Sequence, residues 1–186
     1  FATAEASERE RLRAALDFHP TVSEAFFAKR VVLVEGDTEM AILVRQPKLY
    51  ELAGIDGAVQ RDVSVVSCDG KWTIVPLARL LKAFGIPLRC IHDKDRKKKT
   101  DAELAADPSH EFHANARIAA IVGTEHVYLV DDTIEDILWD EQSRPRSSKD
   151  KPYRAWKRVR ELYSEKTNLD HAPKLRELVQ FAFGSD

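Results

Sequence analysis

Four short runs rich in Val, Ile and Leu alternate with helical segments through the middle of the chain. The predicted strands are Val31–Val34, Val63–Ser67, the run "IPLRCIH" and the run "EHVYLV". Strands that are apolar along their whole length are buried on both faces, which is typical of parallel strands covered by helices. The predicted fold is therefore α/β, with a parallel sheet of about four strands, right-handed crossovers and helices on both faces.

The predicted helices fill the gaps between these strands. Helical spacing runs from Asp37 to about Leu52, where Pro47 is expected to kink the helix or end it early. The next two helices are "WTIVPLARLLKAFG", stopped by Gly85, and "PSHEFHANARIAAIVG", stopped by Gly123. Another helix is expected to start within "TIEDILWD".

The chain divides into three predicted parts. Residues 1–29 form an N-terminal helical segment, residues 30–142 form the α/β domain, and residues 143–186 form a small C-terminal helical extension. The extension begins within the polar loop "EQSRPRSSKDK" and holds two expected helices, Tyr153–Glu165 and Ala172–Phe183.

Composition narrows the class of protein. At 186 residues and 44% apolar content, the chain can build one good core with a small appended lobe. Its net charge of −2 predicts no general affinity for nucleic acids or membranes, so any polyanion has to bind to local clusters of charge. No apolar run approaches the ~20 residues that span a bilayer.

The two cysteines also restrict the possibilities. Cys68 and Cys90 belong to no CxxC pair, which argues against zinc and excludes a disulfide framework. A reducing, cytoplasmic location is the simpler expectation, and the N-terminus has no secretory pattern. Because the sequence starts at Phe1 rather than Met, we expect a piece of a longer protein.

Acidic residues follow the ends of three predicted strands. They are Glu35 after the first, Asp93 and Asp95 after the third, and Asp131 and Asp132 after the fourth, with Glu135 one turn on. Because ligands bind beyond the carboxyl ends of parallel strands, these side chains are expected to meet at one edge. So many negative charges in one place repel one another unless cations neutralise them. Carboxylate oxygens are ligands that suit Mg²⁺ or Mn²⁺. Two such ions ~4 Å apart can hold the attacking and leaving oxygens of a phosphodiester.

Several of these acids also have a local explanation. Asp37 and Glu39 stand at a helix N-terminus, where acids cap free amides and complement the helix dipole, and we assign Asp37 to that role. The explanation is weaker for Glu39 and weakest for Glu35, which follows a strand. Glu135 could simply open a helix, and "DKD" alone is a common loop pattern. The metal site therefore depends on all the acids sharing one edge.

A Glu at the first strand end, a second Glu four residues on and a DxD at the third strand end resemble the Toprim pattern. The ordered runs "FFAKRVVLVEGDTEMAIL", "VSCDGKWTIVPLARLLKAFGIP", "HDKD", "DDTIEDIL" and "KDKPYRAW" are similar to the OLD (overcoming lysogenization defect) family of nucleases. The resemblance implies a Toprim-like sheet and, in the full-length polypeptide, an N-terminal ABC-type ATPase. Nothing here resembles a phosphate-binding P-loop, so we expect the nuclease half without that ATPase.

The resemblance also implies roles for individual residues. It makes Glu35 catalytic and implies two divalent cations, Mg²⁺ or Mn²⁺. The implied metal ligands are Glu35, Glu39, Asp93, Asp95 and Glu135. It further implies a catalytic lysine beyond the sheet, for which Lys151 in "KDKP" is the best match and Lys149 a near competitor. A lysine there can stabilise the charge that develops on the phosphoryl group, and the alternative is a solvated loop lysine.

The third strand leads into the basic run "HDKDRKKKT". Because this run follows the metal acids directly, we predict that it contacts DNA, although a charged and mobile surface is the alternative. Lys71 could pair with a DNA phosphate or with one of the clustered acids. The residues predicted to contact DNA are Lys71, Arg96, Lys97, Lys98 and Lys99. Three histidines are expected to be structural or surface residues, because hard-metal sites do not need imidazole: His92, His110 and His113.

The predicted function is that of a metal-dependent DNA endonuclease or nickase with a two-metal mechanism, whose partners are DNA and the ATPase of the same polypeptide. One alternative is a Toprim module that binds DNA without cutting it. Another is a receiver-like phosphoacceptor domain, but that needs a single Asp at a middle strand end and a lysine at the last one, unlike this chain. No membrane partner is expected, and without the ATPase the chain is expected to be monomeric. DNA preference and the form of cleavage stay open.

Overall fold

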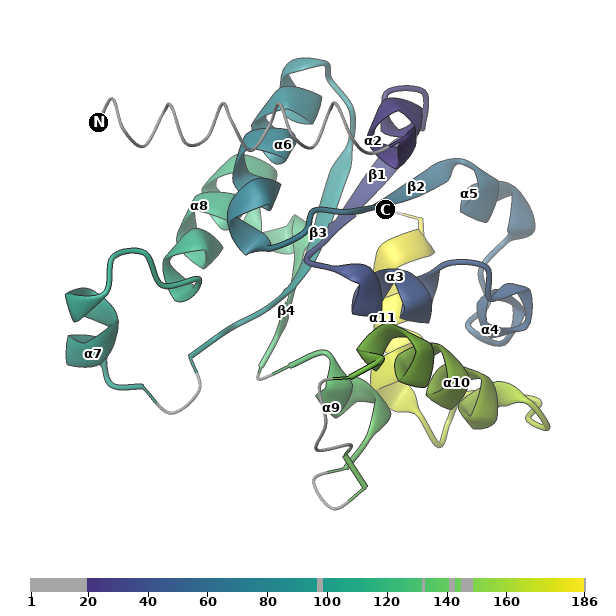
Figure 1. Ribbon diagram of the computed structural model, residues 1–186. Coiled ribbons are helices and arrows are strands. Elements are labelled where there is room, and N and C mark those ends of the chain that lie inside the picture. The colour runs from purple at the N-terminus through teal and green to yellow at the C-terminus, as the bar shows by residue number, and fades with distance from the viewer. Residues whose placement is uncertain (1–19, 97–98, 132, 141–142, 145–148, 186) are drawn as a thin grey trace.

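The computed structural model describes residues 20–96, 99–131, 133–140, 143–144 and 149–185. Its centre is a four-stranded, all-parallel sheet in the order β2-β1-β3-β4 (Figure 1). The strands are β1 (Arg30–Val34), β2 (Val63–Ser67), β3 (Leu88–Asp93) and β4 (Val127–Val130). The predicted α/β fold with a parallel sheet is confirmed.

Strand β1 lies between β2 and β3 and is hydrogen-bonded along both edges. Its last residue, Val34, is level with Ser67 on β2 and Ile91 on β3. Residues 31–34 are fully buried, because alternate side chains face two layers of helices. For this reason the strand has a continuous apolar sequence instead of an alternating one.

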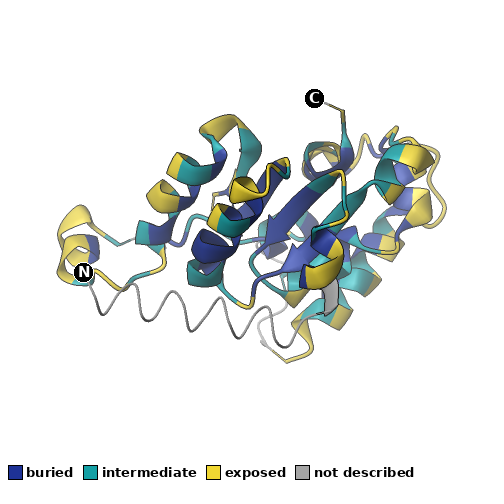
Figure 2. Ribbon diagram, turned by 90° about the horizontal axis from the view of Figure 1, so that it is seen from above, coloured by how far each residue is buried: buried dark blue, intermediate teal, exposed yellow. Residues whose placement is uncertain are grey.

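Helices cover both faces of the sheet (Figure 1). One layer packs on Val31 and Leu33 and consists of α2 (Pro20–Ala25), α6 (Lys71–Ala83) and α8 (Phe112–Val122). The other layer packs on Val32 and Val34 and consists of α3 (Asp37–Leu43), α4 (Pro47–Leu52), α9 (Glu135–Leu138), α10 (Lys151–Tyr163) and α11 (Pro173–Phe183). Figure 2 shows buried strands in the middle and exposed residues on the outer sides of the helices.

The helix predicted from Asp37 to about Leu52 is divided into two. Helix α3 ends at Leu43 and α4 begins at Pro47, because a proline ring fixes φ and lacks an amide N–H, which suits the first turn of a helix. Between them, Arg45 turns the chain with a φ of 60°. Three short elements were not predicted: α5 (Gly57–Arg61), α7 (Asp101–Ala106) and the 3₁₀ helix η1 (Thr124–His126).

Helix α11 packs on the sheet through Phe181, which contacts Tyr128 and Arg89, and α10 packs beside α3. Helices α10 and α11 belong to the same hydrophobic cluster as β1 and α3. The end of α11 is held near the starts of two strands: Arg30 donates to the carbonyl of Phe183 at 3.4 Å and Arg89 to that of Gly184 at 2.9 Å. Cationic groups suit the carbonyl-rich end of a helix. The division at residue 143 stays a prediction, and most of the predicted segment 1–29 lies outside the described residues.

Candidate metal centre

The carboxyl ends of β1 and β3 bring two of the predicted acids together. Glu35 follows β1 and Asp93 ends β3, and these strands are direct neighbours. The backbone N–H of Asp93 donates to Glu35 Oε2 at 3.3 Å. Burial raises the pKa of Glu35, Lys71 opposes this effect, and Asp95 reinforces it. Glu35 is thus a partly buried carboxyl group held at the edge where the sequence predicted ligands.

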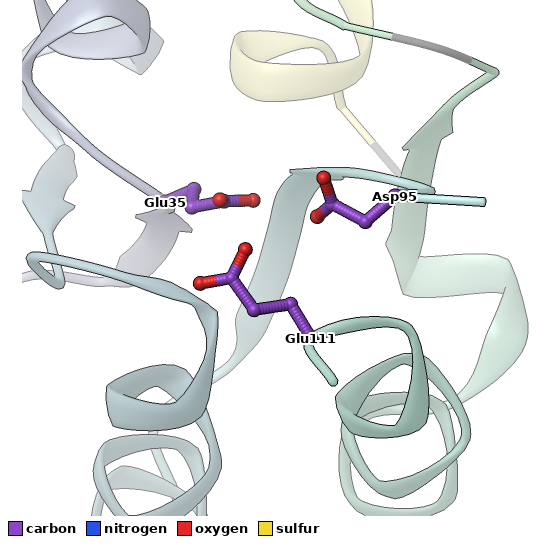
Figure 3. Close-up of side chains that lie close together, drawn as sticks. All are labelled: Glu35, Asp95 and Glu111. Atoms are coloured by element: carbon purple, nitrogen blue, oxygen red, sulfur yellow. The ribbon is translucent and has the colours of Figure 1, made fainter. Parts of the chain in front are cut away.

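Glu35, Asp95 and Glu111 point toward one another from three separate segments (Figure 3). One carboxylate oxygen of each residue lies within 4.8 Å of the other two. Asp95 reaches this position soon after β3 because its backbone turns with a φ of 55°, a left-handed conformation that Asp tolerates better than most residues. Oxygen ligands from three carboxylates fit a hard divalent cation such as Mg²⁺ or Mn²⁺.

Glu111 was not predicted as a member of this group. It directly precedes α8, where the dipole of the helix already explains an acid. No strand ends beside it in the sequence, and α8 belongs to the helical layer that packs on Val31 and Leu33. Only the tertiary fold brings the start of α8 to the carboxyl edge of the sheet, so the sequence carried no more than a weak signal for this residue.

Lys71 places a positive charge inside the acidic cluster. Its side chain is fully buried, its ammonium group contacts a carboxylate oxygen of Asp95 and the carbonyl of Asp93, and Glu35 Oε2 lies 3.9 Å away. Gly70, the residue before Lys71, turns the chain into α6 with a φ of 117°, a conformation that favours glycine. Of the two partners considered for Lys71, the clustered acids are the ones in contact. A fully buried ammonium group does not reach a DNA phosphate in this conformation.

Glu39 and Asp93 lie beside this cluster. Glu39 is 5% exposed in the first turn of α3, where its Oε2 accepts a hydrogen bond from the amide of Gly36 at 3.1 Å. Burial, reinforced by the charge of Glu35, raises the pKa of Glu39 to about 7. Burial likewise raises the pKa of Asp93 to about 8, and the charges of Glu39, Glu35, Asp95 and Glu135 add to it. The five predicted acids are therefore coupled electrostatically at one edge.

Metal affinity is expected to rise with pH. At pH ~6 the metal-free protein holds protons on Asp93 and Glu39 that a bound cation must displace. Each displaced proton makes binding up to about tenfold tighter per pH unit, and the gain ends above pH ~8. The same raised pKa values destabilise the metal-free fold as pH rises from about 4 to about 8, because the folded state holds these protons longer than the unfolded state.

Calorimetric titration of Mn²⁺ into the chain over this pH range measures the effect. Asp93→Asn, which has no proton to release, should flatten the profile. An affinity that is independent of pH in the wild type would show that these carboxyl groups do not bind the ion.

Glu135 and Lys151 are direct partners. They are the first residues of α9 and α10, and their ion pair measures 2.8 Å, while Arg144 lies 3.8 Å from the other oxygen of the same carboxylate. Burial alone would raise the pKa of Glu135, but the hydrogen bond and charge of Lys151, together with hydrogen bonds from its own backbone amide and from Thr133, lower it. The lysine implied by the family resemblance thus adjoins the fifth acid. Its competitor Lys149 is exposed.

The basic run after β3 is described only in part. Arg96 is exposed and pairs with Asp101 on α7 at 2.7 Å, and Lys99 is partly exposed. Lys97 and Lys98 lie outside the described residues. The role of this run in binding DNA stays a prediction.

Among the described residues, Asp131 and Asp37 do not join the cluster. The side chain of Asp131 is 99% exposed and lies 3.6 Å from Lys94. Asp37 is exposed in the first turn of α3, where the helix dipole explains it. Asp132 lies outside the described residues.

Three histidines near the site contact the backbone. The Nδ1 of His92 lies 3.1 Å from the carbonyl of Asp93, and burial lowers the pKa of His92 to about 4. His110 Nδ1 accepts from the amide of Phe112 at 3.2 Å, and His113 Nε2 lies 2.8 Å from the carbonyl of Leu104. These contacts fit the structural roles expected for them.

The cysteines and the hydropathy of the helices agree with what the sequence indicated. Cys68 and Cys90 are free, buried thiols. Among the helices of the described residues, none combines the length and apolar character needed to cross a membrane.

Comparisons with known proteins agree with this geometry. Residues 26–95 match the family model for the TOPRIM domain of overcoming lysogenization defect protein-like proteins. Over 153 residues the chain is 31% identical to the OLD nuclease of Thermus scotoductus (strain ATCC 700910 / SA-01). The match covers 78% of this chain and 28% of that relative, so the chain spans only part of the relative's length. The chain therefore contains a Toprim domain of the OLD-like family.

Proposed function

We propose that the chain is a metal-dependent deoxyribonuclease domain that nicks or cuts DNA by hydrolysing phosphodiester bonds. The observation that carries the proposal is the group of three carboxylates, Glu35, Asp95 and Glu111, at the carboxyl edge of the sheet. The Toprim match and a relative named as a nuclease agree with a nuclease-type metal-binding domain. In the full-length polypeptide, an ABC-type ATPase is the proposed partner of this domain.

We assign the acids to two divalent cations, Mg²⁺ or Mn²⁺, the first group on the distances between its oxygens and the second on the electrostatic interactions of its charges. The first group is Glu35, Asp95 and Glu111. The second is Glu39, Asp93 and Glu135, whose charges act on one another. Asp93 Oδ1 is buried without a hydrogen-bond partner among the described residues, as expected of an atom reserved for a ligand. Cations held by these carboxylates would supply an acidified water as nucleophile and would neutralise charge on the phosphate oxygens.

Lys151 adds a positive charge from the protein itself. Its side chain is 46% exposed while its ammonium group stays within 2.8 Å of Glu135, so it can contact a phosphate oxygen without leaving the site. There it stabilises the negative charge that grows on the phosphoryl group. Arg96, Lys97, Lys98 and Lys99 are the proposed contacts to flanking phosphates, and Lys71 is omitted because it is buried among the acids.

Plasmid cleavage tests the proposal. Supercoiled DNA is incubated with the chain in Mg²⁺, Mn²⁺, Ca²⁺ or EDTA, and nicked or linear products are expected with Mg²⁺ or Mn²⁺ and not with EDTA. Asp131→Asn should cut like the wild type, because it removes an exposed acid at the end of β4 that lies outside the cluster. It is the matched control for substitutions of the clustered acids. DNA that is bound but left intact under every metal would instead identify a non-cleaving Toprim module.

Lys151→Ala is expected to slow cleavage about 100-fold, because the transition state loses a positive charge at the phosphoryl group. Lys149→Ala is the matched control and should retain nearly the full rate. Single-turnover cleavage with saturating Mg²⁺ measures the chemical step for both variants. The opposite pattern, with the loss in Lys149→Ala alone, would transfer the catalytic role to Lys149.

A further inference from the structure

One flank of α10 carries a stack of two aromatic rings and a guanidinium group. The rings of Tyr153 and Trp156 are 6.0 Å apart with planes 23° from parallel, and the guanidinium of Arg160 lies 4.7 Å from the centre of the Trp156 ring. The three residues follow one another along the helix axis, so Trp156 lies between the other two. Tyr153 therefore ends the stack at the same end of α10 as Lys151.

Tyr153 is open to a ligand. Its side chain is 63% exposed, which makes it one of the few exposed large hydrophobic residues of the described chain. Ala155, Val159 and Tyr163 commit one side of α10 to the core, and the stack lies on the flank beside it, with Trp156 partly buried and Tyr153 exposed. An apolar ring held on its neighbour and left exposed is a ready surface for another flat group.

The charge of α10 indicates what that group belongs to. The helix holds five cationic residues and one acid, Glu161, in a chain whose overall net charge is −2. The cations are Lys151, Arg154, Lys157, Arg158 and Arg160. Aromatic rings interleaved with cations on one surface are typical of proteins that bind single-stranded nucleic acids, in which bases stack on the rings and phosphates meet the cations.

The position of α10 connects this surface to the metal centre. Its first residue, Lys151, pairs with Glu135, and the helix packs beside α3, which carries Glu39 (Figure 1). We propose that an unpaired base of the nucleic-acid substrate stacks on Tyr153, so that the strand is cut where it is single-stranded or locally opened. This inference rests on the proposed nuclease function. A duplex keeps its base faces covered, so its affinity owes little to Tyr153 and more to the cations of α10.

The test measures binding in EDTA, where no cutting occurs. A short fluorescein-labelled single strand and the matched duplex are titrated with the 186-residue chain, and the anisotropy of the label is recorded. Tyr153→Ala is expected to weaken single-strand binding about tenfold and to leave duplex binding unchanged within about twofold. Tyr153→Phe keeps the ring and should bind like the wild type, whereas Lys157→Ala should weaken both substrates alike.

Phe27→Ala is the control for loss of an exposed ring. Phe27 is 90% exposed and precedes β1, so it lies at the amino ends of the strands, away from the clustered acids. Thermal melting checks that each variant is folded. Equal weakening of both substrates by Tyr153→Ala, no weakening at all, or a wild type that fails to bind single strands would each overturn the inference. A wild type that binds single strands through Tyr153 without cutting DNA would uphold the stacking site and reject the nuclease.

Discussion

Replacing Glu111 by glutamine is expected to slow metal-dependent cleavage by about 100- to 1000-fold. The substitution keeps the size of the side chain but removes the charge from one of three carboxylates whose oxygens lie within 4.8 Å of one another. Loss of several kcal/mol of charge stabilisation by the cation corresponds to this range of rates. Because Glu111 is exposed before α8, the fold should be retained, and an unchanged melting temperature in EDTA would show this.

Calorimetry provides the second measurement for this variant. Mn²⁺ should bind less tightly to Glu111→Gln and to Glu35→Gln than to the wild type, while Asp131→Asn serves as the matched control with wild-type affinity. If Glu111→Gln cleaves at the wild-type rate, Glu111 only complements the dipole of α8 and does not bind the cation. The first cation would then have to be held by Glu35 and Asp95 without it.

Lys71→Met is expected to destabilise the metal-free chain by about 3 kcal/mol, which corresponds to a melting temperature lower by roughly 6–12 °C. Methionine fills a similar volume, but the carboxylates of Asp95 and Glu35 lose the only buried lysine of the described residues. Removing one partner of a buried ion pair is costly because the remaining charge stays poorly solvated. Saturating Mg²⁺ should recover part of the loss, because a cation neutralises the same oxygens.

Lys29→Met is the matched control for this experiment. Lys29 also pairs with an acid, Asp62 at 2.8 Å, but its side chain is 78% exposed. Exposed ion pairs contribute at most about 1 kcal/mol, so the control should melt close to the wild type. Equal melting temperatures for the two variants in EDTA would mean that Lys71 does not balance the charge of the acidic edge.

The predictions that succeeded from sequence were those with local causes. Strand β1 could be recognised because burial on both faces demands an unbroken apolar run. An interruption at Pro47 could be expected because proline does not fit the middle of a helix, although the sequence did not show that the proline begins α4. Glu35 and Asp95 could be placed at one edge because both follow parallel strands. Each of these inferences needs only neighbouring residues and the rule that parallel strands end together.

The features that escaped prediction depend on pairs that are distant in sequence. Glu111 reaches Glu35 only after α8 folds back over the sheet. For Lys71, the sequence left open a DNA phosphate or one of the clustered acids, and only the fold shows the contact with Asp95, 24 residues away. The stack on α10 was also missed, because helical spacing places Tyr153 and Trp156 on one face but does not reveal which face is left exposed. Side-chain pairing across elements has no local signal.

The strand-start edge of the sheet has a consequence for how the domain can be attached to others. Lys29 and Ser185 border one cavity of about 220 Å³ beside the starts of β1 and β2, and Arg30 holds the carbonyl of Phe183. The residue before β1 and the residues after α11 therefore lie close together, at the end of the sheet opposite Glu35 and Asp95. A tether or an inserted module fixed at either point leaves the acidic edge clear for a long polymer to pass across it.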